Sequence, residues 1–336
     1  MKDSRVDLAR RKGMIGFAGL ATTALLTPRW SVAQADTGNY PNKPIELVIP
    51  FAPGGGVDLF GRTVARVLND EKIVPESIQI INEPGAGGAI GMADMVQRRK
   101  GDPYSLLGIS IHVHLTPLTM GTQYSYKDMT PIAKLFTEYN LMVVQTDSPI
   151  KSLKDVEASL KKDPGQLKFG GATVGNSDQI TLSKFATGIG VDPTKLTYIG
   201  YSGGESNAAI LGGHVDVGFG GLDLIDLVEA GKMRVLGISA PKRLGGRFKD
   251  QPTFTEQGYN VLNDTWRGIF GPPGISADEI KYWQDAFTKL DQSAGWKAEL
   301  DKNQWVDAFE TTTFLATLDK EHEVYKTLLG QLGLVK

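Results

Sequence analysis

The chain has 336 residues, a formal net charge of −2 and no cysteine. The lack of cysteine excludes disulfide bonds, thiolate metal sites, a cysteine nucleophile and a lipid-anchored cysteine. The slightly acidic balance argues against nucleic acid or an anionic membrane as a partner. Because the length exceeds what one hydrophobic core usually organises, we expect two lobes.

The first 35 residues have the composition of an export signal. Three basic residues at 10–12 precede an apolar run from Met14 to Leu26, and Ala33-Gln34-Ala35 follows as a cleavage site. This order predicts a leader that is cleaved near Ala35 and a mature protein in a bacterial periplasm. The paired arginines leave the general secretory and the twin-arginine routes open. Without residues 1–35 the formal net charge becomes about −6.

Strand-like and helix-like runs alternate through most of the remaining chain. This alternation predicts an α/β fold with mostly parallel sheets. From Ser276 onward the pattern is helical only, with a closing helix over 311–329, and these helices are expected to wrap the first lobe. The strand-like runs lie at 45–51, 78–82, 105–110, 141–145, 196–201, 215–219 and 234–239.

The order of these runs also predicts how the two lobes divide the chain. We expect residues 36–140 and 241–336 to form the first lobe, and residues 141–240 to form a second lobe that is inserted between the halves of the first. In this arrangement the chain passes between the lobes twice, which permits hinge closure with the ligand in the cleft between the lobes.

A glycine-rich turn occurs twice between a strand-like and a helix-like run. Gly54–Gly56 is followed by Asp58, and Gly203-Gly204 is followed by Asn207. Glycine lets the backbone turn tightly and approach a ligand closely, while aspartate and asparagine suit the capping of the first helical turn. The remaining amides at the positive end of a helix favour an anion. The two turns therefore predict two lobes that grip one acidic ligand.

Four separated motifs then carry a family resemblance: Phe-Ala-Pro-Gly-Gly-Gly-Val-Asp at 51–58, Asn-Glu-Pro-Gly-Ala-Gly-Gly at 82–88, Leu-Gly-Gly-His-Val-Asp at 211–216 and Trp-Arg-Gly at 266–268. In this order they resemble the periplasmic receptors of tripartite tricarboxylate transporters, also called Bug receptors. The resemblance implies a two-lobed periplasmic-binding-protein fold of the Venus flytrap, type II-like kind. It also implies a non-enzymatic receptor that delivers a small carboxylate to a permease of one large and one small membrane subunit. We further expect a monomer without cofactor, and we expect no metal because His112-x-His114 has no third metal ligand apparent from sequence.

The resemblance also implies a set of ligand-binding residues. Backbone amides of two first-lobe loops and two second-lobe turns would hold one ligand carboxylate, partly through water. In the first lobe these are Phe51, Ala52, Pro53, Gly54, Gly55, Gly56 and Asp58 together with Gly85, Ala86, Gly87 and Gly88. In the second lobe they are Thr173, Gly175, Asn176, Ser177, Ser202, Gly203 and Gly204.

The specificity of the site is expected from a few other side chains. Arg267 can bind a second carboxylate through two parallel charge-assisted hydrogen bonds; alternatively it pairs with Asp264 or Glu205 and only supports the fold. Glu205 together with the Trp-Arg-Gly motif at 266–268 resembles the subgroup around the tricarboxylate receptor, and this resemblance implies citrate-like di- or tricarboxylates. Trp266 is expected beside the cleft. Ser110 and His112 follow a predicted strand and are expected to line the cleft; the alternative for His112 is a surface histidine. Asp58 has an alternative role as a helix cap that pairs with Arg62.

The competing hypothesis is a serine hydrolase, because Gly200-Tyr201-Ser202-Gly203-Gly204 satisfies G-x-S-x-G between a strand and a helix. Its base would have to be His214, expected at the far end of the same helix, or His322, which lies in a charged helical pattern typical of a solvated face. No His-Gly-Gly-Gly run supplies an oxyanion loop. The sequence therefore favours binding over catalysis.

Overall fold

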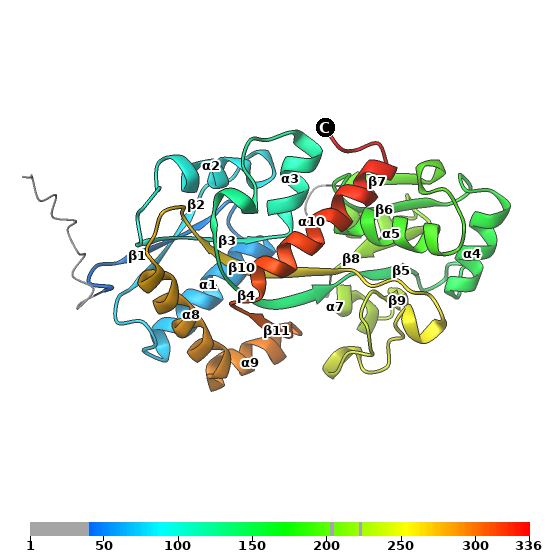
Figure 1. Cartoon of the computed structure of the whole chain (residues 1–336). Coiled ribbons are helices and arrows are strands. Elements are labelled where there is room, and N and C mark those ends of the chain that lie inside the picture. Colours follow the sequence, from blue (N-terminus) through cyan, green and yellow to red (C-terminus); the bar gives the residue numbers. More distant parts are fainter. Residues whose placement is uncertain (1–39, 202–204, 222–223) are drawn as a thin grey trace, which may run out of the picture. The chain divides into compact units, whose positions relative to one another are not determined.

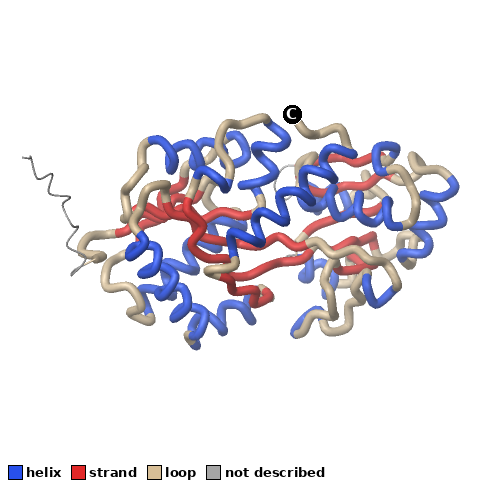
Figure 2. Tube along the Cα trace, viewed as in Figure 1, coloured by secondary structure: helices blue, strands red, loops and turns tan. Residues whose placement is uncertain are grey.

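The computed structural model describes residues 40–201, 205–221 and 224–336, and Asn39–Lys336 form one compact unit. Within it lie two β-sheets with helices beside them (Figures 1 and 2). The predicted export signal falls outside the described residues. Among the described residues, no helix is both long and apolar enough to cross a bilayer.

The first sheet has the strand order β11-β4-β10-β3-β1-β2 and the second has β7-β6-β8-β5-β9. The strands are β1 (Ile45–Ile49), β2 (Ile78–Asn82), β3 (Ser105–Ser110), β4 (Thr130–Tyr139), β5 (Leu141–Gln145), β6 (Lys168–Ala172), β7 (Thr197–Tyr201), β8 (Val217–Gly220), β9 (Met233–Ile238), β10 (Asp264–Gly271) and β11 (Val306–Glu310). The helices are α1 (Gly56–Asp70), α2 (Ala89–Gln97), α3 (His112–Met120), α4 (Leu153–Lys162), α5 (Ser177–Gly188), α6 (Glu205–Leu211), α7 (Ile225–Glu229), α8 (Ala277–Gln292), α9 (Ala294–Asn303) and α10 (Phe314–Gln331).

The predicted α/β class is confirmed, but the expectation of mostly parallel sheets is wrong. β1 runs parallel to β2 and β3, and β6 runs parallel to β7 and β8. β10 is antiparallel to both of its neighbours, as is β5, and β11 is antiparallel to β4. The antiparallel strands include those next to the two passages between the sheets, where no crossover helix sets a parallel direction. An apolar run in the sequence carries no information about direction.

Four strands, β4, β6, β10 and β11, were not among the predicted runs. β11 also contradicts the expectation of helices alone after Ser276. It is an edge strand whose residues are mostly half-exposed, so its sequence lacks the apolar run that marks a buried strand. The predicted helix start is confirmed: Ser276 caps α8, and its hydroxyl accepts from the Glu279 amide at 3.3 Å in a capping box.

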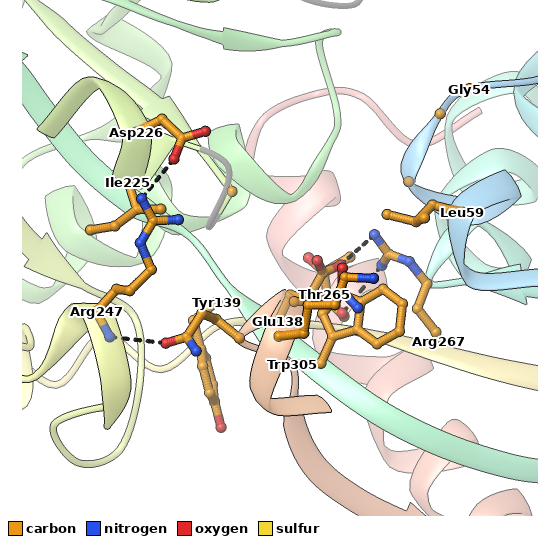
Figure 3. A pocket seen from close by; sticks show the side chains of 16 residues that line it. Gly54, Leu59, Glu138, Tyr139, Ile225, Asp226, Arg247, Thr265, Arg267 and Trp305 are labelled. Atoms are coloured by element: carbon orange, nitrogen blue, oxygen red, sulfur yellow. Dashed lines mark hydrogen bonds and ion pairs between the residues drawn. The ribbon is translucent and has the colours of Figure 1, made fainter. Parts of the chain in front are cut away.

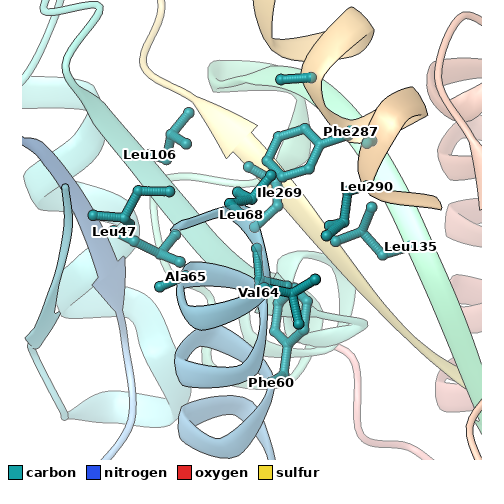
Figure 4. Packing of buried hydrophobic residues seen from close by; sticks show 14 of the residues in the cluster. Leu47, Phe60, Val64, Ala65, Leu68, Leu106, Leu135, Ile269, Phe287 and Leu290 are labelled. Carbon is teal, nitrogen blue, oxygen red and sulfur yellow. The ribbon is translucent and has the colours of Figure 1, made fainter. Parts of the chain in front are cut away.

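The first sheet and its helices form the core that positions the glycine turn at Gly54–Gly56. Phe60, Val64 and Leu68 follow one another at helical spacing on α1 and are fully or almost fully buried. They share a cluster with sheet residues such as Leu47 and with Phe287 and Leu290 of α8 (Figure 4). Packing along the whole of α1 therefore fixes the position of its first turn.

The chain passes from the first sheet to the second at Asn140 and returns after Asn263. Between β9 and β10, Phe254 and Val261 pack in a cluster with Met142 of the second sheet. Ser239, directly after β9, links the two passages: the Asn140 amide donates to its Oγ at 2.9 Å and the Asn263 amide donates to its carbonyl at 3.1 Å.

Candidate functional site

The turn between β1 and α1 is held by a buried carboxylate. Asp58 Oδ2 accepts from the Gly54 amide and from Arg62 Nε, both at 2.9 Å, and Oδ1 accepts from Asn82 Nδ2 at 2.9 Å. Burial acts to raise the pKa of Asp58, but these donors outweigh it and lower the pKa, which keeps the carboxylate ionised. The predicted pairing of Asp58 with Arg62 is confirmed, but the predicted cap is not: Gly55 is the N-cap of α1, and the carboxylate binds the Gly54 amide in the turn before the helix. Gly54 has φ +86°, a conformation that favours glycine.

Beside this turn lies a cavity of about 570 Å³ (Figure 3). Some of its lining residues lie on the first sheet or on helices and loops next to it, and the others lie after strands of the second sheet. From the first come Gly54, Gly55, Gly56, Leu59, Glu138, Tyr139, Thr265, Arg267, Lys302, Asn303, Gln304 and Trp305; from the second come Gly221, Ile225, Asp226 and Arg247. A cavity of this size suits a small organic ligand.

The guanidinium of Arg267, in β10, lies beside the start of α1. A methyl group built on Gly56 would lie 3.4 Å from Arg267 Nη2, so the guanidinium and the first helical turn face the same space. Nη2 pairs with Glu138 Oε2 at 2.5 Å, and Nη1 donates to Ser110 Oγ at 3.2 Å. Nε is buried and has no hydrogen-bond partner among the described residues. Arg267 thus has an acidic partner, as the alternative role required, but this partner is Glu138 and not Asp264 or Glu205.

Ser110 and His112 lie behind Arg267 and do not line the cavity. Ser110 is fully buried, and its hydroxyl donates to the Trp266 carbonyl at 2.5 Å while accepting from Arg267. The His112 ring lies 4.7 Å from the Phe51 ring. Burial, and then the positive charge of Arg267, lower the pKa of His112 to about 4, so the ring is neutral at physiological pH.

The titration of His112 gives a testable pH dependence. Its folded-state pKa of about 4 lies below the ordinary value of 6.5, so the unfolded chain takes up the proton first and stability falls as the pH drops through this window. We expect His112 to contribute about 1–2 kcal/mol of lost stability between pH 7 and pH 5. Urea unfolding of His112→Phe, which keeps a ring against Phe51, should show a decline that is smaller by this amount.

The matched control for that experiment is His214→Phe, because His214 is exposed and follows α6. This variant should retain the pH dependence of the parent protein. A pH slope in His112→Phe equal to that of the parent would show that His112 does not titrate as described.

The second predicted loop of the first lobe packs against neighbouring elements. Gly87 accepts a hydrogen bond at its carbonyl from Thr116 Oγ1 at 2.6 Å, and a methyl group on Gly88 would lie 3.3 Å from Phe51 Cζ. Gly87 and Gly88 are therefore close to α3 and Phe51, and neither they nor Gly85 and Ala86 line the cavity. Ala52 and Pro53 are exposed beside the lining glycines.

The turn between β6 and α5 faces elements of the first sheet. A methyl group on Gly175 would lie 3.1 Å from Thr119 Cγ2 of α3, while Asn176 caps α5 and Thr173 is exposed. Ser177 is buried, and its hydroxyl lies 2.7 Å from Asn140 Oδ1 and 2.9 Å from Thr265 Oγ1. The strand-to-helix turn that we predicted is present, but none of these residues lines the cavity.

Trp266 was expected beside the cleft, but the structure places its side chain in the core. Neighbouring residues of a strand face opposite sides, so Thr265 and Arg267 line the cavity while Trp266 points away from it. The indole is fully buried, packs against Phe314 at 5.2 Å and donates to Glu321 Oε2 at 2.7 Å.

The second glycine turn, Ser202, Gly203 and Gly204, lies outside the described residues, so the proposed nucleophile has no described geometry. Glu205 begins α6 and is exposed. His322 is not on a solvated face as expected: its ring lies 5.5 Å from Tyr126 and 5.7 Å from His114, and burial lowers its pKa. Within the described part of the chain, no group of three or more acidic or histidine side chains could hold a metal ion.

The sequence carried no sign of the residues that line the cavity opposite Arg267, which are Asp226 and Arg247 and are called the Asp226–Arg247 wall below. Arg247 pairs with Asp226 at 2.7 Å and with Glu229 at 2.5 Å, and its backbone amide donates to Gln304 Oε1 at 3.2 Å. These residues come from short helices and connections without a recognisable motif. Glu138 was missed because β4 was missed, and the alternation of side chains along a correctly placed β4 would have been the signal.

Two β-sheets with a cavity lined by residues from both halves define a two-lobed α/β protein of the solute-binding class. The chain belongs to the tripartite tricarboxylate transporter receptor family, because residues 62–319 match the sequence model of this family. The UPF0065 protein in the gbd 5' region of Cupriavidus necator is 31% identical over 334 residues, which cover 97% of this chain and 99% of that protein. The resemblance found in the motifs is therefore confirmed.

Solved structures share this fold. A TctC solute-binding protein from Polaromonas, without ligand, has a TM-score of 0.73 and 26% identity over 88% of this chain and 100% of that one. Rpa4515 of R. palustris with adipate has a TM-score of 0.76 and 22% identity over 88% and 99%. MatC from Rhodopseudomonas palustris with bound malate has a TM-score of 0.66 and 21% identity over 88% and 100%. The family and these neighbours are binding proteins rather than enzymes.

Proposed function

We propose that this protein is a periplasmic receptor that captures a small carboxylate in the cavity beside Gly54–Gly56. The observation that supports this most directly is the convergence of Arg267 with the start of α1, where a methyl group on Gly56 would touch the guanidinium at 3.4 Å. A carboxylate there would accept from backbone amides and from a planar arginine fork at the same time.

The binding mechanism that we propose is closure of two lobes around the ligand. We expected the second lobe to end at residue 240, but we now propose that it extends to residue 263, because Phe248, Phe254 and Val261 after β9 pack with the second sheet. A ligand that contacts Arg267 on one side and the Asp226–Arg247 wall on the other favours the closed state, since only that state offers both sets of contacts. The closed receptor would then present its ligand to a permease of one large and one small subunit.

For the ligand, we propose citrate-like di- or tricarboxylates. The motif of Glu205 with Trp266-Arg267 supports this class, and the related structures with adipate and malate show dicarboxylates in proteins of the same fold. Export through the leader at residues 1–35 would bring the receptor to the periplasm, where such acids enter the cell.

A thermal-shift panel tests the proposed function. The purified protein is heated with dicarboxylates, tricarboxylates, aromatic acids, amino acids and, separately, ester substrates that are followed for hydrolysis. A ligand at 100 times its dissociation constant adds about 2.7 kcal/mol to stability, so one class of carboxylate should raise the melting temperature clearly. No shift with any acid, or turnover of an ester, would contradict the proposal and support a nucleophilic Ser202.

A further inference from the structure

Glu138 neutralises the arginine of the cavity. Its Oε2 lies 2.5 Å from Arg267 Nη2, and the two side chains are only 22% and 11% exposed. Glu138 of β4 pairs in register with Thr265 of β10, two residues before Arg267. Both charged side chains line the same cavity (Figure 3), so a ligand that reaches the guanidinium also reaches the carboxylate.

The other basic side chains that line the described part of the cavity also have acidic partners. Arg247 lies 2.7 Å from Asp226 and 2.5 Å from Glu229, and Lys302 Nζ lies 3.5 Å from Glu299. The wall therefore alternates in charge and has no cluster of uncompensated cations among the described residues. A ligand cannot rely on excess positive charge alone to offset several carboxylates.

Arg267 requires a hydrogen-bond acceptor on the ligand, whereas Glu138 beside it requires a donor. A carboxylate beside Arg267 gains from the guanidinium and from the first turn of α1, but is repelled by Glu138. An ionised glutamate only accepts hydrogen bonds, so the ligand atom that faces Glu138 must be a donor. A hydroxyl or ammonium group on the carbon next to the carboxylate meets both requirements.

We propose that Glu138 is a specificity-determining residue that selects carboxylates with an adjacent hydroxyl or ammonium donor. The ligand carboxylate meets Arg267 and the start of α1, and the donor meets Glu138. This inference rests on the proposed function, because it assigns a substrate class to the same cavity. It distinguishes malate from succinate and citrate from tricarballylate, pairs that differ by a single hydroxyl.

The test is calorimetric titration of the purified protein and of Glu138→Gln with these two pairs and with aspartate. The parent protein should bind the hydroxyl-bearing or ammonium-bearing member about tenfold more tightly than its unsubstituted partner. In Glu138→Gln this ratio should fall below about threefold, and succinate should bind more tightly than to the parent, because the repulsion is removed. A larger ratio for aspartate than for malate would identify the donor as ammonium.

Glu256→Gln is the matched control, since Glu256 pairs with Arg243 at 3.1 Å on residues that do not line the cavity. Its ligand ratios should equal those of the parent. Equal affinity of the parent for malate, aspartate and succinate would overturn the inference even if Glu138→Gln did not fold. Unchanged ratios in a folded Glu138→Gln would overturn it as well. If no carboxylate binds to the parent at all, it is the proposed function that fails.

Discussion

Replacing Arg267 by alanine is expected to lower the affinity for every carboxylate ligand by about 100-fold or more. Each charge-assisted hydrogen bond from the guanidinium to a ligand carboxylate contributes about 1.5–3 kcal/mol, and every 1.4 kcal/mol is a factor of ten in affinity. The change also leaves Glu138 without the partner that lies 2.5 Å away, so an uncompensated negative charge faces the ligand. Isothermal titration with the best acid of the thermal-shift panel measures the loss.

Two further variants separate these effects. Glu138→Gln combined with Arg267→Gln removes both charges, and its affinity should remain well below that of the parent because the arginine fork is missing. Arg243→Ala removes an arginine of an exposed ion pair outside the cavity and should bind as the parent does. Undiminished affinity in Arg267→Ala for all acids would remove Arg267 from the binding site.

Among the substitutions described, Asn140→Ala is expected to lower the free energy of unfolding most. Asn140 is buried at the first passage between the sheets, where its Nδ2 donates to Asp178 and its Oδ1 accepts from Ser177 Oγ at 2.7 Å. The variant loses a hydrogen bond to a charged group and one to a hydroxyl in a buried site, which together contribute about 2–4 kcal/mol. Denaturant unfolding should show this decrease in the free energy of unfolding.

The control is Asn260→Ala, because Asn260 is exposed in the connection between β9 and β10. Its free energy of unfolding should stay within about 0.5 kcal/mol of the parent value. The same small change in Asn140→Ala would mean that the polar network at the passages contributes little to stability.

The sequence predicted the first wall of the site better than the second because only the first has a local signal. The glycine turn before α1 can be recognised from Gly54–Gly56 and Asp58, since tight turns and helix starts depend on neighbouring residues. The pair of Arg267 with Glu138 depends on the antiparallel pairing of β4 with β10, which brings together residues 129 positions apart. Such register is set by tertiary packing and leaves no mark in a short window of sequence.

The same limit explains why Trp266 was expected in the cleft and Thr265 was not. The motif at 266–268 identifies a functional strand, but the choice between its two faces requires knowledge of what covers each face. In the structure α10 supplies Glu321 and Phe314 on one face, so the large indole is buried there. Burial of the larger apolar side chain then turns Thr265 and Arg267 toward the cavity.

The placement of the aromatic residues makes intrinsic fluorescence a report on one half of the protein. Trp266, Trp283, Trp296 and Trp305 all pack with the first sheet, and residues 141–263 contain no tryptophan. Trp30, the fifth tryptophan, lies in the predicted leader. In the mature protein, emission excited at the red edge of the indole band therefore follows the first half alone, whereas circular dichroism follows both. Trp305 also lines the cavity and stacks on Phe136 at 4.0 Å, so its emission is a natural optical probe of an arriving ligand.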